Sequence, residues 1–243
     1  MNNDPQASTS QPTATEIQRL FDRIAPVYDQ LNQRLSFGIH RVWKLMAVKW
    51  AAPRRGDRAL DLCCGSGDLA LLMAPRVGAQ GCVIGADFSA AQLAIARQRA
   101  TSRYPALPLH WQQADALDLP FPDNYFHCAT LGYGLRNLTD IASGLRQLQR
   151  VLVPGGRAAI LDFHHPEGPL AQMFQDWYLA QIVVPAAAEL GCADDYAYIA
   201  PSLARFPSGS RQVQLAQQAG FGQAVHYAIA GGLMGVLVAT KVV

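Results

Sequence analysis

A short glycine-rich segment, Leu60 to Leu69, combines residue types and spacing that indicate chemistry. Gly65 and Gly67 stand between an apolar run and a helical pattern, which predicts a strand, a tight turn and a helix. Glycine lets the backbone turn sharply and approach a ligand, and the free N–H groups of the following helix attract its anionic part. Asp87 ends a second apolar run and is placed to accept hydrogen bonds from both hydroxyls of a ribose. The segment therefore predicts a nucleotide-cofactor pocket.

The glycine spacing alone does not identify the cofactor. Gly65-x-Gly67-x-x-Ala70, with an acid about twenty residues on, also matches the dinucleotide fingerprint, and ordinary strand-turn-helix units contain it too. Three further features are informative: Asp61 inside the first strand, Asp115 after a third strand-like run, and a Pro-Gly-Gly turn at 154–156. Together these features resemble class I S-adenosylmethionine methyltransferases.

The elements that must position these residues alternate along the chain. Strands are expected at 58–62, 81–86, 109–113, 125–131, 157–163, 223–230 and 233–242, and helices at 15–28, 38–50, 68–76, 89–103, 139–151, 169–188 and 210–219. This alternation predicts an α/β fold of the class I methyltransferase type: a Rossmann-like, seven-stranded, mostly parallel sheet with an antiparallel C-terminal strand. We expect a disordered tail over 1–15, a helical extension or lid over 16–56, and the methyltransferase domain over 57–243.

Composition argues for an enzyme of the cytoplasm. The 243 residues are 50% hydrophobic, enough for one sizeable core, and the net charge of +2 carries no nucleic-acid signature. The five cysteines show no metal-type spacing, which implies a reducing compartment and predicts no metal. The polar first 15 residues lack the features of a signal peptide, and the longest apolar run, 228–240, is too short to span a bilayer.

Four segments of the sequence make the resemblance specific to one family of methyltransferases. They are Phe21-Asp22-Arg23-Ile24-Ala25 with Tyr28-Asp29 and Leu35-Ser36-Phe37-Gly38-Ile39-His40-Arg41-x-Trp43-Lys44, the Gly65-Ser66-Gly67-Asp68-Leu69 loop, Leu119-Pro120-Phe121-Pro122-Asp123-Asn124, and Gly134-Leu135-Arg136-Asn137 with Arg150-Val151-Leu152-x-Pro154-Gly155-Gly156. The chain resembles the quinone C-methyltransferase family of ubiquinone and menaquinone biosynthesis, and Cys63-Cys64 before the loop is similar to its cyanobacterial and plastid branch. The resemblance implies S-adenosylmethionine-dependent methylation of demethylphylloquinol to phylloquinol, the last step of phylloquinone synthesis.

The resemblance also implies site residues. Candidates for cofactor binding are Tyr28, Asp61, Gly65, Ser66, Gly67, Asp87, Phe88, Asp115, Ala116 and Gly132. The ubiquinone branch usually has serine at the position of Gly132, so we expect backbone contact there. Because a ring carbon attacks only when an adjacent hydroxyl loses its proton, the site needs correct positioning and a proton acceptor.

Arg136 and Asn137 are expected to hold the quinol oxygens or a water that takes the proton. The alternative for Arg136 is a structural ion pair with a carboxylate such as Asp140. His164 is a second choice as base, because histidine titrates near neutrality, although a loop histidine more often has no catalytic role.

Other assignments stay open. Leu170, Met173, Phe174, Trp177, Tyr178, Ile182 and Val183 recur at helical spacing, which favours core packing over a phytyl channel or membrane contact. The resemblance implies a small lipid quinol as the substrate. Peripheral contact with the thylakoid membrane and oligomerisation both stay open. The alternatives are demethylmenaquinol or a ubiquinone-precursor benzoquinol as substrate, an NAD-dependent oxidoreductase, and a cofactor-binding module without activity. The chain has no Tyr-x-x-x-Lys, which counts against the oxidoreductase.

Overall fold

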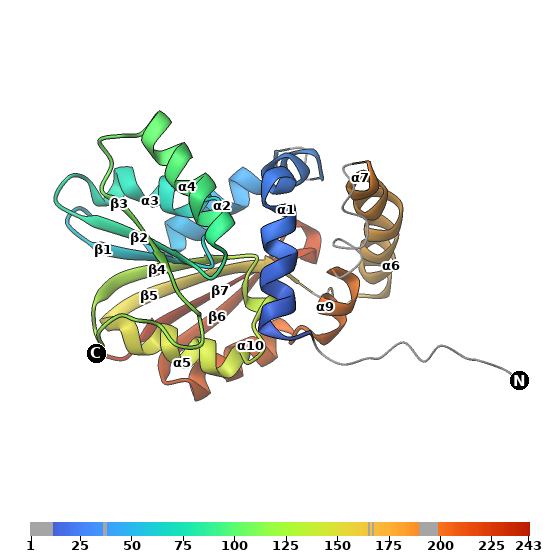
Figure 1. The fold of residues 1–243 in the computed structure, drawn as a ribbon. Coiled ribbons are helices and arrows are strands. Elements are labelled where there is room, and N and C mark those ends of the chain that lie inside the picture. Colours follow the sequence, from blue (N-terminus) through green and yellow to red (C-terminus); the bar gives the residue numbers. More distant parts are fainter. Residues whose placement is uncertain (1–11, 36–37, 165, 167, 190–198) are drawn as a thin grey trace, which may run out of the picture.

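The fold is a seven-stranded sheet with helices on both faces (Figure 1). In this computed structural model the described residues are 12–35, 38–164, 166, 168–189 and 199–243. The strands are β1 Arg58–Leu62, β2 Cys82–Asp87, β3 Leu109–Gln113, β4 Phe126–Gly132, β5 Leu152–Phe163, β6 Phe221–Ile229 and β7 Met234–Lys241. Their order is β3-β2-β1-β4-β5-β7-β6, and β7 runs antiparallel to both of its neighbours. The predicted sheet is confirmed.

The helices cover the two faces of the sheet. They are α1 Ala14–Leu35, α2 His40–Ala51, α3 Asp68–Val77, α4 Ala90–Arg103, α5 Ile141–Val151, α6 Pro169–Tyr178, α7 Val184–Ala188, α9 Ile199–Arg205 and α10 Gly209–Gln218, with short helical turns η1 Leu135–Asn137, η2 Leu179–Val183 and η3 Ala230–Gly232. Buried residues of α5 and α10 pack on one face, and those of α2 and α3 on the other. Each face contributes an apolar core that holds the strand ends in place.

Register brings the strand ends into one row. Leu62 at the end of β1 pairs with Ala86 of β2 on one side and with Leu131 of β4 on the other. The parallel strands β3, β2, β1, β4 and β5 therefore present their carboxyl ends at one edge, where open α/β sheets bind ligands.

Helix α1 joins the sheet to the remaining helices. Figure 1 shows it standing across the molecule between the sheet and α6, α7 and α9. Ile24 of α1 packs with Leu179, Val183 and Leu203 in a small separate apolar cluster. This cluster attaches the helical segments to α1, and Phe163 of β5 packs against both this cluster and the core on the α2 and α3 face of the sheet.

Several predicted boundaries need correction. Helix α1 begins at Ala14 and continues to Leu35, and residues 1–11 of the expected tail lie outside the described residues. The single helix expected over 169–188 contains a π-helical turn at Leu179–Val183, and α9 was not expected. Residues 152–156 are part of β5, but Leu152 pairs with Phe126 and Arg157 with Cys128, and Gly155 has a φ of +76°, so the expected Pro-Gly-Gly turn interrupts the strand. Met173, Trp177 and Ile182 are exposed, so core packing was wrong for these three side chains.

No helix among the described residues combines the length and the apolar character that crossing a membrane requires.

Candidate functional site

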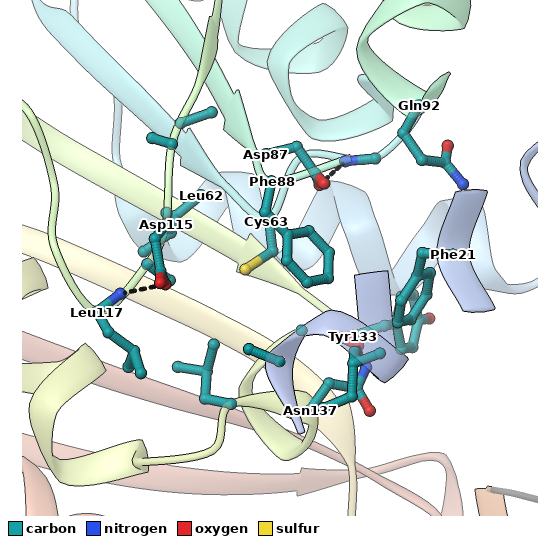
Figure 2. A pocket seen from close by; sticks show the side chains of 18 of the residues that line it. Phe21, Leu62, Cys63, Asp87, Phe88, Gln92, Asp115, Leu117, Tyr133 and Asn137 are labelled. Carbon is teal, nitrogen blue, oxygen red and sulfur yellow. Dashed lines mark hydrogen bonds between the residues drawn. The ribbon is translucent and has the colours of Figure 1, made fainter. Parts of the chain in front are cut away.

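A cleft opens where the carboxyl ends of β1, β2 and β4 meet helix α1. It contains about 750 Å³ of empty space, part of it open to solvent. Its walls include Ala14, Ile17, Phe21, Leu62, Cys63, Gly65, Ala86, Asp87, Phe88, Gln92, Asp115, Ala116, Leu117, Gly132, Tyr133, Gly134, Asn137 and Leu138. Figure 2 shows Phe21 of α1 facing the side that carries Cys63 and Phe88. The cleft lies where the sequence placed the cofactor.

Asp87 and Gly65 form the turn at the centre of the cleft. The Gly65 N–H donates to Oδ2 of Asp87 at 2.8 Å, and the Ser89 N–H donates to Oδ1 at 2.9 Å. Burial raises the pKa of Asp87 to about 6, although these two backbone hydrogen bonds favour the charged form. Asp87 therefore presents a fixed carboxylate to the cleft, as the ribose assignment requires.

The other two loop residues, Ser66 and Gly67, do not line the cleft. A Cβ on Gly67 would clash with the ring of Trp111, and φ at Gly67 is +88°. Arg99 donates to the Ser66 hydroxyl at 2.8 Å and to its carbonyl oxygen at 2.9 Å. Gly67 is thus explained by packing against Trp111, and Ser66 by its attachment to α4.

Asp61 also lies behind the loop, away from the cleft. It is fully buried and accepts from the Ala70 N–H at 2.8 Å and from the Thr130 hydroxyl at 2.9 Å. Burial raises its pKa to about 7. Asp61 therefore connects β1, β4 and the start of α3, and its contacts support the loop without reaching a ligand.

The first turn of α3 is anchored by an ion-pair cluster. Asp68 accepts from Lys44 of α2 at 2.7 Å and from Arg99 of α4 at 2.5 Å. Burial acts to raise the pKa of Asp68, but the two cations outweigh it and hold the pKa well below its usual range. The Lys44 ammonium also lies 5.8 Å from the centre of the Tyr133 ring, which lines the cleft. This cluster links α2, α3 and α4 to the cleft wall.

The far end of the cleft has the features expected for an adenine site. Asp115 and Ala116 both line it, and Asp115 Oδ1 accepts from the Leu117 N–H at 2.9 Å. Gly132 lines it as well, and a Cβ there would lie 2.7 Å from Leu69 Cδ1.

Arg136 is held in an ion pair outside the main cleft. Its Nη1 lies 2.5 Å from Asp162 Oδ1, with 8% and 3% of the two side chains exposed, and the same nitrogen donates to the Tyr133 carbonyl at 2.9 Å. The partner is Asp162, whereas the alternative considered for this arginine was Asp140; Asp140 instead caps α5 by accepting from the Ser143 N–H. The ion pair thus fixes the segment that leads from Tyr133 to Asn137.

Asn137 lies at the cleft wall. Its Nδ2 donates to the Tyr133 carbonyl at 3.1 Å, and its buried Oδ1 has no hydrogen-bond partner in the described part of the chain. Because a buried amide oxygen without a partner is costly, this atom is available to accept a hydrogen bond from a ligand.

His164 is a further sequence candidate that does not line the cleft, and Tyr28 is a candidate whose side chain is not described. His164 is buried and its ring lies against that of His226, with ring centres 4.8 Å apart and an angle of 34° between the rings, and both line a separate cavity beside β6. The structure therefore does not bring His164 to the cofactor edge. Tyr28 belongs to α1, but its side chain lies outside the described residues. The extension instead contributes Ile17 and Phe21 to the cleft.

Gln92 was missed by the sequence argument. It lies in the first turn of α4, it is 1% exposed, and it lines the cleft together with Asp87 and Gly65 (Figure 2). Neither its Nε2 nor its Oε1 has a hydrogen-bond partner among the described residues. The available signal was its place five residues after Asp87, because that position lies in the first turn of the helix that starts at the cleft.

The electrostatics of the cleft favour a cation. Burial raises the pKa of the Cys63 thiol well above its usual value, and the negative charges of Asp87, Asp61, Asp162 and Asp115 raise it further. Of these carboxylates, Asp87 and Asp115 line the cleft and offer a positively charged ligand the opposite field, and the buried amides of Gln92 and Asn137 offer it hydrogen bonds. The residues therefore fit S-adenosylmethionine, which combines a sulfonium cation with ribose hydroxyls. Among the described residues there is no group of three His, Cys, Asp or Glu side chains that could hold a metal ion.

Comparison with known sequences gives consistent matches. The model of the ubiE/COQ5 methyltransferase family matches residues 9–241. A 2-phytyl-1,4-naphthoquinone methyltransferase of Synechococcus elongatus is 61% identical, with 91% of this chain and 95% of the relative covered. One of Trichormus variabilis is 58% identical, with 93% and 99% covered. A chloroplastic 2-phytyl-1,4-β-naphthoquinone methyltransferase of Arabidopsis thaliana is 47% identical, with 91% and 86% covered.

Solved structures share the fold at low sequence identity. A S-adenosylmethionine-dependent methyltransferase of Aquifex aeolicus has a TM-score of 0.59 and 17% identity, with 95% of this chain and 100% of that chain covered. The [4+2]-cyclase SpnF has a TM-score of 0.64 and 20% identity, with 96% and 97% covered. Because the same fold carries a cyclase, the fold by itself does not specify the reaction.

Proposed function

The chain belongs to the ubiE/COQ5 methyltransferase family, and from this premise we propose that it transfers the methyl group of S-adenosylmethionine to a ring carbon of 2-phytyl-1,4-naphthoquinol. The S–CH3 bond breaks as the ring carbon forms its bond to the methyl group, and the products are phylloquinol, S-adenosylhomocysteine and the proton that the ring carbon loses. The observation that supports this substrate is the sequence identity to relatives named for this reaction, which is 58% and 61% over more than nine-tenths of the chain. Family membership leaves the NAD-dependent oxidoreductase and the inactive binding module without support.

Cofactor binding is assigned to the residues of the cleft. We propose that Asp87 and Gln92 take the ribose hydroxyls, that Asp115 and Ala116 meet the adenine, and that the backbone at Gly65 and Gly132 approaches the remainder. When bound, S-adenosylmethionine supplies an electrophilic methyl group. The fixed Asp87 carboxylate and the buried Gln92 amide orient it, because both side chains are already held in place by packing.

The acceptor end is assigned to Asn137 and its support. Asn137 Oδ1 accepts a hydrogen bond from a quinol hydroxyl and thereby orients the ring. Arg136 acts as a positioning residue, since its guanidinium is engaged by Asp162 and the Tyr133 carbonyl and does not line the cleft. Helix α1, in the extension over 16–56, acts as a lid through Ile17 and Phe21, and excludes water from the reacting groups.

The test is methyl transfer from labelled S-adenosylmethionine to three reduced quinones: demethylphylloquinone, demethylmenaquinone and a ubiquinone precursor. We expect the highest kcat/KM for demethylphylloquinol. The Asn137→Ala variant should lose about 10- to 100-fold in kcat and retain cofactor affinity, because one hydrogen bond to a developing charge is removed. Arg136→Ala should lose activity, and Arg136→Lys should recover part of it, since lysine keeps the ion pair with Asp162. A clear preference for the benzoquinol would overturn the substrate assignment.

A further inference from the structure

Helix α2 presents an apolar and basic face to solvent. Ile39 is 50% exposed, Val42 54% and Leu45 43%, and they are three of the eleven exposed large apolar side chains among the described residues. Arg41 and Lys49 are exposed on the same side, because residues 39, 41, 42, 45 and 49 fall within one arc of a helix with 3.6 residues per turn. These five residues are called the α2 face. The opposite arc, which includes Ala47, Val48 and Ala51, is buried against the sheet.

Basic charge is concentrated around this face. Between Gln30 and Gly56 the sequence has six basic residues and no acidic one, whereas the whole chain carries a net charge of +2; Lys44 is buried in its ion pair, and Arg41, Lys49, Arg54 and Arg55 are exposed. The rest of the chain is therefore net negative, by four charges. Arg54 and Arg55, directly after α2, are exposed and continue the basic character. Basic residues beside exposed apolar ones are typical of helices that lie in the surface of an anionic membrane.

The α2 face is directly connected to the cleft. Lys44, on the inner side of the same helix, pairs with Asp68 and lies over the ring of Tyr133, which lines the cleft. At the start of the helix, the Gly38 N–H donates to the Gln33 carbonyl of α1 at 3.2 Å, and α1 also supplies Ile17 and Phe21 to the cleft. A surface that bound the α2 face would thus lie beside the lid.

We infer that the α2 face docks the protein on an anionic lipid surface, from which the phytyl-bearing substrate enters the cleft. The inference rests on the proposed lipid substrate. Val42, Leu45 and Ile39 enter the boundary between head groups and acyl chains, and Arg41 and Lys49 pair with anionic head groups.

A second exposed apolar stripe, on α6 and η2, lacks the basic residues that accompany the α2 face. Met173, Trp177 and Ile182 are exposed on α6 and η2, where residues 169–188 contain no Lys or Arg and include the exposed Asp176. This stripe lacks the charge that an anionic surface would attract, so the α2 face is the better candidate.

The test is co-sedimentation of the full chain with phosphatidylcholine vesicles that contain or lack phosphatidylglycerol, at low and high salt. We expect binding that requires phosphatidylglycerol and falls with salt. Each basic residue near an anionic surface contributes roughly fivefold, so the Arg41→Gln/Lys49→Gln variant should bind about 30-fold more weakly. The matched control is Arg97→Gln/Arg211→Gln, which removes the same charge from exposed residues of α4 and α10 and should bind like the wild type. Val42→Ser/Leu45→Ser should also weaken binding.

Activity measurements separate this inference from the proposed function. With a short-chain quinol in detergent, the Arg41→Gln/Lys49→Gln variant should match the wild type; with the phytyl quinol in anionic vesicles, it should be slower. Equal vesicle binding by this variant and its control, or loss of binding only in Met173→Ser/Trp177→Ser, would overturn the docking assignment. If vesicle binding behaves as expected but no quinol is methylated, the proposed function fails and the docking face stands.

Discussion

At the scale of single residues, Gln92 gives the sharpest test of the cofactor assignment. Its buried amide has no partner among the described residues, so Gln92→Leu removes an unsatisfied polar group from the ligand-free protein. We expect the free energy of unfolding to rise by about 1–3 kcal/mol, and the affinity for S-adenosylmethionine to fall about 10- to 100-fold, because two hydrogen bonds to the ligand are lost. Chemical denaturation and calorimetric titration measure the two effects.

Gln212 provides the matched control. It is also buried, at 2% exposed, but its Nε2 donates to the Pro207 carbonyl at 2.8 Å. Gln212→Leu should therefore lower stability and leave cofactor affinity unchanged. If Gln92→Leu behaved like Gln212→Leu, the ribose role of Gln92 would be wrong.

Asp87 predicts how cofactor binding depends on pH. Burial raises its pKa to about 6 in the ligand-free protein, and the ionised carboxylate is the better acceptor for two hydroxyls. The affinity for S-adenosylmethionine should be about tenfold weaker at about pH 5 than at about pH 7.5, because only about a tenth of the Asp87 carboxyl groups are ionised at pH 5. Titration calorimetry at both pH values, with Asp87→Asn as control, measures this. An unchanged affinity for the wild type would contradict the role of Asp87.

The raised pKa of Asp87 also makes the stability of the folded protein fall as the pH rises, whereas the affinity for the cofactor increases. Because the folded-state pKa of Asp87 is raised, the folded protein holds more protons than the unfolded chain between about pH 4 and pH 6. The contribution of Asp87 to stability is complete below that interval and is lost as the pH rises through it. Asp61, whose pKa burial raises to about 7, extends the decline by a further pH unit.

The residue types and their spacing predicted where the cleft lies, but they did not predict the role of each residue in it. Asp87, Gly65 and Asp115 could be assigned because strand ends converge at one edge of a parallel sheet. The local pattern could not separate Gly65, which lines the cleft, from Gly67, which accommodates Trp111 from a strand some forty residues away. Unsatisfied buried atoms such as those of Gln92 are likewise a property of the folded packing, and no sequence period reports them.

At the scale of elements, the contact between the glycine loop and β3 predicts a stability effect. Gly67→Ala introduces a Cβ into the ring of Trp111 at a φ of +88°, so it should lower the free energy of unfolding by about 2–4 kcal/mol from strain and overpacking together. Gly231→Ala, at a φ of +66° and a ψ of +20° with nothing within 4 Å, should lose only about 1–2 kcal/mol from strain. Urea denaturation of both variants compares them. Equal losses would show that Trp111 yields without cost.

Helices and strands with a clear hydrophobic period could be predicted from the sequence, whereas irregular turns within them could not. The seven strands follow from apolar runs separated by turn residues, as in β1, β2 and β7. The sequence signal for the break at η2 is Pro185, which has no N–H to donate to the Gln181 carbonyl, but a proline does not specify a π-helical turn. The exposed side of α6 shows the same limit: a helical apolar stripe does not reveal which side is buried.

At the scale of the whole molecule, α1 and α2 join the cleft to a surface. Helix α1 closes the cleft through Ile17 and Phe21, and α2 carries the exposed basic and apolar face while Lys44 contacts the cleft wall. Sequence predicted a helical extension, but its contact with the cleft depends on long-range packing that a local pattern cannot encode. The arrangement suits an enzyme that takes a water-soluble cofactor and a lipid acceptor from different surroundings.

The most direct test of this account is the position of the transferred methyl group. The full chain would be incubated with ¹³C-methyl S-adenosylmethionine and reduced 2-phytyl-1,4-naphthoquinone, and the product would be examined by NMR and mass spectrometry. The account predicts one labelled methyl group on the quinone ring carbon next to the phytyl chain, and its loss in Asp87→Ala. A methyl ether on a quinol oxygen, or no labelled quinone from an enzyme that binds the cofactor, would contradict it.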